Sequence, residues 1–217
     1  KLKNYTEVAL VLSKKYAAVV ANPPYMGQES MNVQLKDYVN AQYPMTKADL
    51  FAVFMEVCLA LNRSNGLMGM INQHSWMFLS SFENLRTKLI KTCHIDSLLH
   101  MGRGIFGVDW GSVAFVYSPN GSKGEGQYFR LHQRNFQHIY FQHIGQLFLK
   151  VKNNGTFKYD FTTYRDEDVS SIETFDFKYS EDGLQLYFKA DQSNFAMIPG
   201  CPIGYWVSEK MITVFRN

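Results

Sequence analysis

The sequence predicts an α/β fold in which a mostly parallel β-sheet is covered by helices on both faces. Between Tyr16 and Ser118, short apolar segments alternate with longer amphipathic segments, and the links between them are rich in glycine and polar residues. Of the 217 residues, 46% are hydrophobic, which is enough to bury a core. In sheets of this kind, ligands bind outside the carboxyl ends of the strands.

The first strand is expected at Tyr16–Ala21, where the short apolar run YAAVVA predicts a buried strand. It ends at Asn22-Pro23-Pro24-Tyr25. Two consecutive prolines remove two backbone donors and fix two φ angles, so the tetrapeptide must leave the sheet as a stiff, extended turn. In isolation these four residues would also fit a simple surface turn. Their position after an apolar strand favours a site that must keep its shape.

Two amphipathic helices are expected after this turn. Thr46 is expected to cap the first helix, with Asp49 completing a variant of the capping box and Gly66 marking the helix end. Ser80 and Glu83 form a capping box at the start of the second helix. Apolar residues fall at helical spacing in both segments, so both helices are expected to face the core.

Further strands are expected at 67–71, 95–101 and 112–118, from the sequences LMGMI, IDSLLHM and SVAFVYS. Beyond about Asp160 the pattern becomes irregular and acidic. We therefore expect two parts, residues 1–159, which contain the sheet, and residues 160–217, which start a second subdomain.

The net charge of +3 is unevenly distributed. Residues 101–159 carry seven basic and two acidic side chains, whereas residues 160–217 carry five and ten. The basic part contains YFRLHQRNFQHIYFQH, in which cations alternate with aromatic residues. Arg130 and Arg134 of this segment, and Arg103 upstream of it, are candidates to follow the phosphate backbone of a nucleic acid. A charge excess of this size is also typical of a solvated face.

Cysteine usage and hydropathy exclude several classes of protein. Cys58, Cys93 and Cys201 are far apart and odd in number, so neither a disulfide framework nor a metal site is expected. No apolar run reaches the roughly 18 residues of a membrane span, and the first residues, KLKNYTEVAL, do not form a signal peptide. These features predict a cytoplasmic protein without a membrane partner. The absence of an initial Met suggests a fragment.

Three segments carry a resemblance to a known family. VVANPPYMG resembles the catalytic motif of class I methyltransferases that act on an exocyclic or amide nitrogen, and KADLFAVFMEV resembles the next block of gamma-type adenine-N6 DNA methyltransferases. IPGCPIGYWVSEK resembles the entry to the target-recognition region of PglX-type enzymes of BREX phage-defence systems. The resemblance implies the C-terminal half of a class I (Rossmann-like) doubly wound sheet, with residues 1–159 as the catalytic half and 160–217 leading into the recognition domain.

The resemblance also implies a reaction, the transfer of a methyl group from S-adenosylmethionine to N6 of an adenine flipped out of duplex DNA. The side-chain oxygen of Asn22 and the main-chain oxygen of Pro23 would each accept one N6 hydrogen, and Pro23 and Pro24 would hold that main-chain oxygen still. Tyr25 would stack on the flipped base. Duplex DNA and other defence-system proteins are the expected partners.

Three other residues are weighed for the same pocket. The resemblance assigns Phe106, in GRGIFGVDWG, as an aromatic wall opposite Tyr25, although an ordinary core position fits it equally well. Asp49 is expected first as a helix cap and second as a residue of the target-base pocket. His74 follows a strand end, where a structural histidine is favoured over a cleft residue. We assign no general base.

The residues that bind the cofactor stay unassigned, and the resemblance implies that the main cofactor-binding elements lie upstream of Lys1. In the family, a glycine-rich turn and an acidic residue that binds the ribose precede the catalytic motif, but residues 1–21 contain no glycine and only Glu7 as an acid. Gly102, Gly104 and Gly107 spell G-x-G-x-x-G, but a strand rather than a helix is expected to follow them.

Two further expectations follow from this missing part. We expect the chain by itself to be inactive and to bind S-adenosylmethionine weakly or not at all, because its own residues do not supply the cofactor motif. We also expect the incomplete sheet to have one edge and one face uncovered.

Two alternatives stay open at this point. The same tetrapeptide occurs in methyltransferases that act on protein glutamine or on RNA guanine, although the region after the sheet argues against the glutamine enzymes. The chain could also be a non-catalytic DNA-binding or assembly module of a defence complex.

Overall fold

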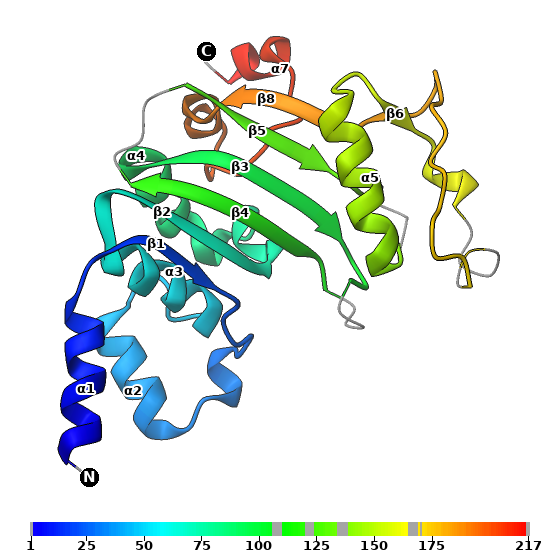
Figure 1. Cartoon of the computed structure of the whole chain (residues 1–217). Coiled ribbons are helices and arrows are strands. Elements are labelled where there is room, and N and C mark those ends of the chain that lie inside the picture. The colour runs from blue at the N-terminus through cyan, green and yellow to red at the C-terminus, as the bar shows by residue number, and fades with distance from the viewer. Residues whose placement is uncertain are drawn as a thin grey trace.

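The computed structural model describes residues 2–105, 110–119, 124–133, 139–164, 169 and 171–215. Its centre is a six-stranded sheet with the strand order β1-β2-β4-β3-β5-β8 (Figure 1). The strands are β1 (Tyr16–Ala21), β2 (Asn62–Gln73), β3 (Cys93–Gly102), β4 (Ser112–Pro119), β5 (Glu125–Arg130) and β8 (Tyr187–Asp191). A separate two-stranded ribbon joins β6 (Lys158–Tyr159) to β7 (Leu184–Gln185).

The strand directions are mixed. β1 is parallel to β2 and β3 is parallel to β5, whereas β4 is antiparallel to both β2 and β3, and β8 is antiparallel to β5. Four strands, β1, β2, β3 and β5, therefore end at one side of the sheet, which we call the carboxyl edge (Figure 1). The α/β fold is confirmed. The sheet is less parallel than expected because β4 turns back from β3 and inserts between β3 and β2.

Helices cover the two faces of the sheet unequally (Figure 1). The helices are α1 (Leu2–Ser13), α2 (Val33–Gln42), α3 (Leu50–Leu61), α4 (Glu83–Thr92), α5 (Phe141–Asn153) and α7 (Glu209–Val214). α3 and α4 pack on one face, and α5 lies against the other face near β5. Within the described part of the chain, no helix has the length and apolar character needed to cross a membrane.

The first core-facing helix, α3, has a different cap from the one expected. Asp49 is the N-cap, and its side chain accepts a hydrogen bond from the backbone N–H of Phe51. Thr46 is instead buried, and its hydroxyl donates to Glu56 Oε1 at 2.7 Å. Gly66 does not end the helix, because it lies within β2. A Cβ at Gly66 would come within 2.9 Å of the carbonyl oxygen of Ala17, so glycine lets β1 approach β2 closely.

The start of α4 also corrects an expectation. A short 3-10 turn, Ser80–Phe82, precedes the helix, and Phe82 occupies the N-cap position without a side-chain hydrogen bond. The expected capping box of Ser80 and Glu83 is therefore wrong, because Ser80 lies in the 3-10 turn. The expected buried face is correct: Phe82, Leu85, Leu89 and Cys93 all belong to the core beneath the sheet.

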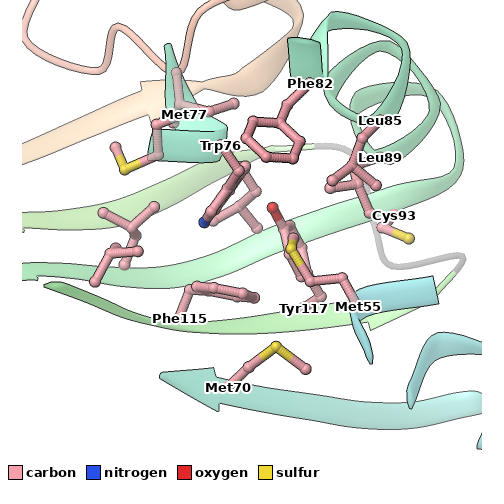
Figure 2. Packing of buried hydrophobic residues seen from close by; sticks show 14 of the residues in the cluster. Met55, Met70, Trp76, Met77, Phe82, Leu85, Leu89, Cys93, Phe115 and Tyr117 are labelled. Atoms are coloured by element: carbon pink, nitrogen blue, oxygen red, sulfur yellow. The ribbon is translucent and has the colours of Figure 1, made fainter. Parts of the chain in front are cut away.

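The main core lies between the sheet and helices α3 and α4 (Figure 2). Its sulfur-containing and aromatic side chains include Met55, Met70, Trp76, Met77, Phe82, Phe115 and Tyr117. The indole N–H of Trp76 donates to Asn72 Oδ1 at 3.0 Å, so a fully buried polar pair sits inside this apolar packing. A second core fills the space between the other face and α5.

The region after residue 160 packs on the same sheet. It supplies β8 to the sheet, and Phe195, Ile203 and Tyr205 to the main core. Arg86 is 1% exposed, and its guanidinium holds part of this region in place by hydrogen bonds. It donates to the carbonyl oxygens of Gly200, Cys201, Trp76 and Leu79 at 2.6–3.1 Å. The division between residues 1–159 and 160–217 as functional units stays a prediction.

β1 is an edge strand of the described sheet, and it is not buried as its apolar sequence predicted. It pairs only with β2, and the side chain of Val20 is 83% exposed. Beside it, on the face that α5 covers in part, lies a hollow of about 460 Å³. Its lining is mainly apolar and comes from β1 to β5 and from Phe148 of α5. As expected, one edge and part of one face of the described sheet are uncovered.

Candidate functional site

The tetrapeptide Asn22-Pro23-Pro24-Tyr25 lies at the carboxyl edge, directly after β1. Asn22 and Pro24 are exposed, Pro23 is buried, and Tyr25 is half-buried. The turn thus presents one polar side chain at the end of the strand, while its first proline anchors it to the fold. The sequence predicted that the tetrapeptide leaves the sheet as an extended turn, and residues 22–25 have no regular secondary structure.

The start of α3 holds the loop after Tyr25 in place. Asp49 Oδ1 accepts hydrogen bonds from the backbone N–H groups of Met26 at 3.0 Å and Phe51 at 3.1 Å. The backbone N–H of Leu50 donates to the carbonyl oxygen of Met26 at 3.0 Å, and that of Gln28 donates to Ala48 at 3.3 Å. Burial raises the pKa of Asp49, although the backbone hydrogen bonds oppose that shift.

Tyr25 packs edge-to-face against two aromatic rings. Its ring centroid lies 6.3 Å from that of Phe51 and 6.4 Å from that of Trp110, with interplanar angles of 88° and 80°. Its hydroxyl donates to Asn22 Oδ1 at 3.4 Å. Burial raises the pKa of Tyr25, so the phenol stays protonated at neutral pH. The two polar groups of the tetrapeptide therefore point toward each other.

Trp110 lies beside the candidate site, and sequence reasoning did not consider it. Phe106, the expected aromatic wall, lies outside the described residues, whereas Trp110 of the same GRGIFGVDWG segment contacts Tyr25 and is 45% exposed. The next residue, Gly111, is in close contact with His74: a Cβ there would lie 2.2 Å from the imidazole. This close approach fixes the backbone beside Trp110. The resemblance pointed to Phe106 of this segment and not to Trp110.

The hollow beside β1 does not by itself fit S-adenosylmethionine. Asn22 and Ser97 are the polar side chains of its described lining, which includes no carboxylate to bind the ribose hydroxyls. Gly102 and Gly104 have positive φ angles of 83° and 78°, but the next described element is the strand β4, so the described part of this link offers no helix N-terminus to the cofactor. We therefore assign no cofactor contact to the described residues.

The expected cofactor-binding elements upstream of Lys1 stay a prediction. Lys1 lies outside the described residues, and α1 is the first described element, beginning at Leu2. The sequence of α1, LKNYTEVALVLS, contains no glycine-rich turn. The described start of the chain therefore supplies no glycine-rich turn for the cofactor.

A cluster of three histidines, His74, His100 and His132, lies at the carboxyl edge near the ends of β2, β3 and β5. His74 Nδ1 and His100 Nε2 are 2.7 Å apart, and the ring centroids of His100 and His132 are 4.2 Å apart. Burial and nearby positive charge lower the pKa of each, to about 4 for His132. The cluster is therefore neutral at pH 7. The backbone N–H of His74 also donates to the carbonyl oxygen of Gly111, which fits a structural role.

Two of the three arginines expected on DNA lie at this edge. Arg103 is exposed just beyond β3, and Arg130 is the last residue of β5. The guanidinium carbon of Arg130 lies 5.4 Å from the ring centroid of Trp206. Arg134 lies outside the described residues. Among those residues, no group of three or more His, Cys, Asp and Glu side chains could hold a metal ion.

Comparison with known proteins indicates the class of protein. Residues 2–106 match the Eco57I restriction-modification methylase family. Over its whole length the chain is related to named adenine-specific methyltransferases. It is 34% identical to PglX from Lacticaseibacillus casei (strain Zhang), over 100% of this chain and 16% of that protein. It is 33% identical to BrxX from Escherichia coli O9:H4 (strain HS), over 97% of this chain and 15% of that protein.

These relatives confirm the resemblance to PglX-type enzymes, while the chain spans only 16% and 15% of their lengths. Solved structures confirm the fold. The methyltransferase subunit of a type I restriction-modification system from Streptococcus thermophilus superimposes with a TM-score of 0.52 at 13% identity, over 88% of this chain and 37% of that one. DrdV, in a complex with DNA, gives 0.53 at 13% identity, over 97% of this chain and 20% of that one.

Proposed function

We propose that this chain is the catalytic segment of a DNA methyltransferase that modifies N6 of adenine, in restriction-modification or phage defence. The observation that carries the proposal is the tetrapeptide Asn22-Pro23-Pro24-Tyr25 at the carboxyl end of β1, in a chain related to enzymes named adenine-specific methyltransferases. The chemistry of the adenine amino group explains why such a turn is needed.

The N6 lone pair of adenine is delocalised into the ring, so the amine is a poor nucleophile. An enzyme must favour a pyramidal nitrogen by binding both of its hydrogens. Asn22 Oδ1 and the carbonyl oxygen of Pro23 are the two acceptors in our proposal. The double proline and the hydrogen bonds of Asp49 to the following loop hold this pair of acceptors in position before the base arrives.

The flipped adenine must also be held by its faces. Tyr25 is the stacking residue in our proposal, because its half-buried ring is already braced by Phe51 and Trp110. Trp110, which is more exposed than Tyr25, is placed to form a second wall of the base pocket. Phe106 keeps its proposed role as an aromatic wall, and Asp49 contributes through the loop that it holds.

S-adenosylmethionine is the methyl donor in this proposal, and it would supply an electrophilic methyl group to N6. Duplex DNA is the substrate, and other defence-system proteins are the expected partners. Arg103, Arg130 and Arg134 bind the DNA backbone. Two of these arginines lie at the same edge as the tetrapeptide, which supports their assignment.

A substrate comparison tests the proposal. The full-length protein is incubated with S-adenosylmethionine and duplex DNA, RNA or a protein extract, and the products are hydrolysed and analysed by mass spectrometry. We expect N6-methyladenine in the DNA alone. Methylation only of glutamine or of RNA guanine, or no methylation of any substrate, would contradict the proposal.

A further inference from the structure

An aromatic surface extends along the carboxyl edge beyond the proposed base pocket. Phe78 and Trp206 are 36% and 38% exposed, and their ring centroids are 5.8 Å apart. The guanidinium of Arg130 lies over the Trp206 ring at 5.4 Å. These three residues, which we call the edge platform, come from the segment after β2, the end of β5 and the segment before α7.

Contacts connect the edge platform to the tetrapeptide. Tyr25 contacts Trp110, and the residue after Trp110 packs against His74, as described above. The His74 ring lies 5.8 Å from that of Phe78, and Phe78 in turn contacts Trp206. A nucleic acid strand that places one base at Tyr25 therefore has further aromatic rings along the same edge.

The platform is held rigidly from below. Tyr205, the neighbour of Trp206, is buried, and its ring stacks on that of Tyr128 at 5.0 Å with an interplanar angle of 9°. The hydroxyl of Tyr205 is also hydrogen bonded to His100 Nδ1 at 3.2 Å, and the His100 ring contacts Phe78. Because these rings are fixed before a ligand arrives, little side-chain entropy is lost when a base stacks on them.

The charge of the platform suits a phosphate-bearing ligand. The ion pairs between described residues involve Lys88, His94 and Lys150, not Arg130. The histidine cluster behind the platform is neutral, so its positive charge comes from arginine. An aromatic surface with a guanidinium beside it is the combination that binds unpaired nucleotides, because bases stack on rings and phosphates pair with cations.

We propose that Phe78, Trp206 and Arg130 form a second nucleotide site, which stacks an unpaired base next to the flipped adenine and binds its phosphate. This proposal rests on the proposed function, because it requires the target strand to lie at the carboxyl edge. It explains why two partly exposed aromatic side chains are held in contact with each other and with Arg130 at this edge. Base flipping leaves the neighbouring bases unstacked, and the platform compensates for that loss.

The first experiment measures binding without methylation. The full-length protein is titrated with a fluorescent thymidine oligonucleotide, which contains no adenine, and with an abasic oligonucleotide of equal length, which keeps the phosphates but has no bases. We expect Trp206→Ala to weaken binding of the thymidine oligonucleotide by at least about fivefold and to leave the abasic one unchanged. Arg130→Gln should weaken both, because it removes a phosphate contact.

Matched variants separate stacking from folding. Trp206→Phe keeps a ring and should retain most of the affinity, and Phe78→Leu should reproduce the loss of Trp206→Ala by an independent change. Tyr5→Ala removes an exposed aromatic residue of α1, far along the chain from the platform, and should have no effect. Equal affinities of the Trp206→Ala, Phe78→Leu and unmodified proteins for the thymidine oligonucleotide would overturn the proposal.

A second experiment places the base. In duplexes that carry the sequence methylated by the protein, 5-iododeoxyuridine replaces one base at a time on either side of the target adenine. We expect photocrosslinks from an adjacent position to the peptides that contain Phe78 or Trp206. Crosslinks that avoid both peptides at every position would overturn the site while leaving the methylation result intact. A protein that methylates no DNA would instead refute the proposed function, and oligonucleotide binding would still decide whether the platform stacks bases.

Discussion

Asp49 Oδ1 accepts a hydrogen bond from the backbone N–H of Met26 at 3.0 Å and, through the same oxygen, one from Phe51 at 3.1 Å. One carboxylate therefore caps α3 and holds the residue that follows Tyr25. Removing it should affect two properties of the protein, the stability of the helix start and the position of the tetrapeptide.

We expect Asp49→Ala to lower the free energy of unfolding by about 1–2 kcal/mol, the usual cost of a lost N-cap. The methylation rate should fall further than this loss of stability explains, because the loop after Tyr25 is released. Asp49→Asn keeps an acceptor oxygen at the same position and should retain most of both properties. Urea denaturation and single-turnover methylation measure the two effects. Equal losses in the Ala and Asn variants would show that the charge, not the hydrogen bonds, is needed.

The acceptor role of Asn22 predicts a large kinetic effect. Losing one oriented hydrogen-bond partner of the reacting amine typically costs a few kcal/mol, so Asn22→Ala should slow N6 methylation about a hundredfold or more. The unfolding free energy should change little, because Asn22 is exposed. Near-normal methylation by this variant would refute the assigned role.

Tyr25 offers a matched pair of variants. Tyr25→Phe keeps the ring and removes only the 3.4 Å hydrogen bond to Asn22, so we expect a modest loss of rate. Tyr25→Ala removes the ring that stacks on the base, so a far larger loss is expected. Steady-state kinetics on the methylated duplex compare the two. If both variants lose the same activity, stacking is not the function of the ring.

The arginines at the carboxyl edge predict a change in salt dependence. Replacing Arg103, Arg130 and Arg134 together with Ala should weaken binding to all DNA sequences alike and flatten the slope of log affinity against log salt. Phosphate contacts release counterions without reading bases, so sequence preference should stay the same. Fluorescence anisotropy across a range of salt concentrations measures the slope. If affinity and slope are unchanged, these three arginines belong to an ordinary solvated surface and do not bind DNA.

The histidine cluster predicts that stability falls in mild acid. Burial, with help from Arg130 and His74, lowers the pKa of His132 to about 4, while an unfolded histidine titrates near its usual value of about 6.5. Above pH 6.5, His132 is neutral in both the folded and the unfolded protein, so it does not change the pH dependence of the free energy of unfolding. Below it, the unfolded chain binds a proton that the folded chain excludes, so stability is lost progressively between pH 6.5 and 4.

At pH 5 the lowered pKa of His132 reduces the free energy of unfolding by about 2 kcal/mol. The lowered pKa values of His74 and His100 act in the same direction. Urea denaturation at pH 7.5 and pH 5 measures the loss. His132→Gln should show a smaller drop between the two pH values. A protein equally stable at both would show that the cluster is already protonated or solvated.

The composition of the hollow beside β1 predicts weak cofactor binding by these 217 residues. Its described lining includes no carboxylate for the ribose hydroxyls, so we expect calorimetric titration of the isolated chain with S-adenosylmethionine to show no micromolar site. Hydrophobic contact alone gives little specificity for such a polar ligand. Saturable micromolar binding with one site per chain would show that residues of this chain, rather than elements upstream of Lys1, hold the cofactor.

Sequence reasoning predicted the elements of this fold better than their pairing. The apolar run at Tyr16–Ala21 identified β1 to the residue, because a short apolar segment before two prolines has few alternatives. The prediction that β1 is buried was wrong, because the exposure of a strand depends on which strands pair with it, and that is a tertiary property. The insertion of β4 between β3 and β2 was missed for the same reason, since strand direction leaves no mark in an apolar run.

The candidate site shows the same division. Local chemistry predicted the stiff turn at the tetrapeptide, because prolines act on their own backbone. It placed the helix cap at Thr46 with Asp49 as its capping-box partner, whereas Asp49 itself is the cap. The resemblance assigned Phe106 and did not point to Trp110, because the contact of Trp110 with Tyr25 joins residues 85 positions apart and is a tertiary property. Likewise, the histidine cluster joins residues 26 and 32 positions apart, and no sequence spacing signals such a contact.

The buried guanidinium of Arg86 has a consequence for engineering recognition specificity. By binding the carbonyl oxygens of Gly200 and Cys201, it makes the segment up to Tyr205 part of the rigid body that holds the tetrapeptide. A chimera that exchanges sequence-reading modules should therefore be joined after Trp206, since a junction near residue 160 would cut through a shared core and separate the new module from its alignment with the catalytic turn.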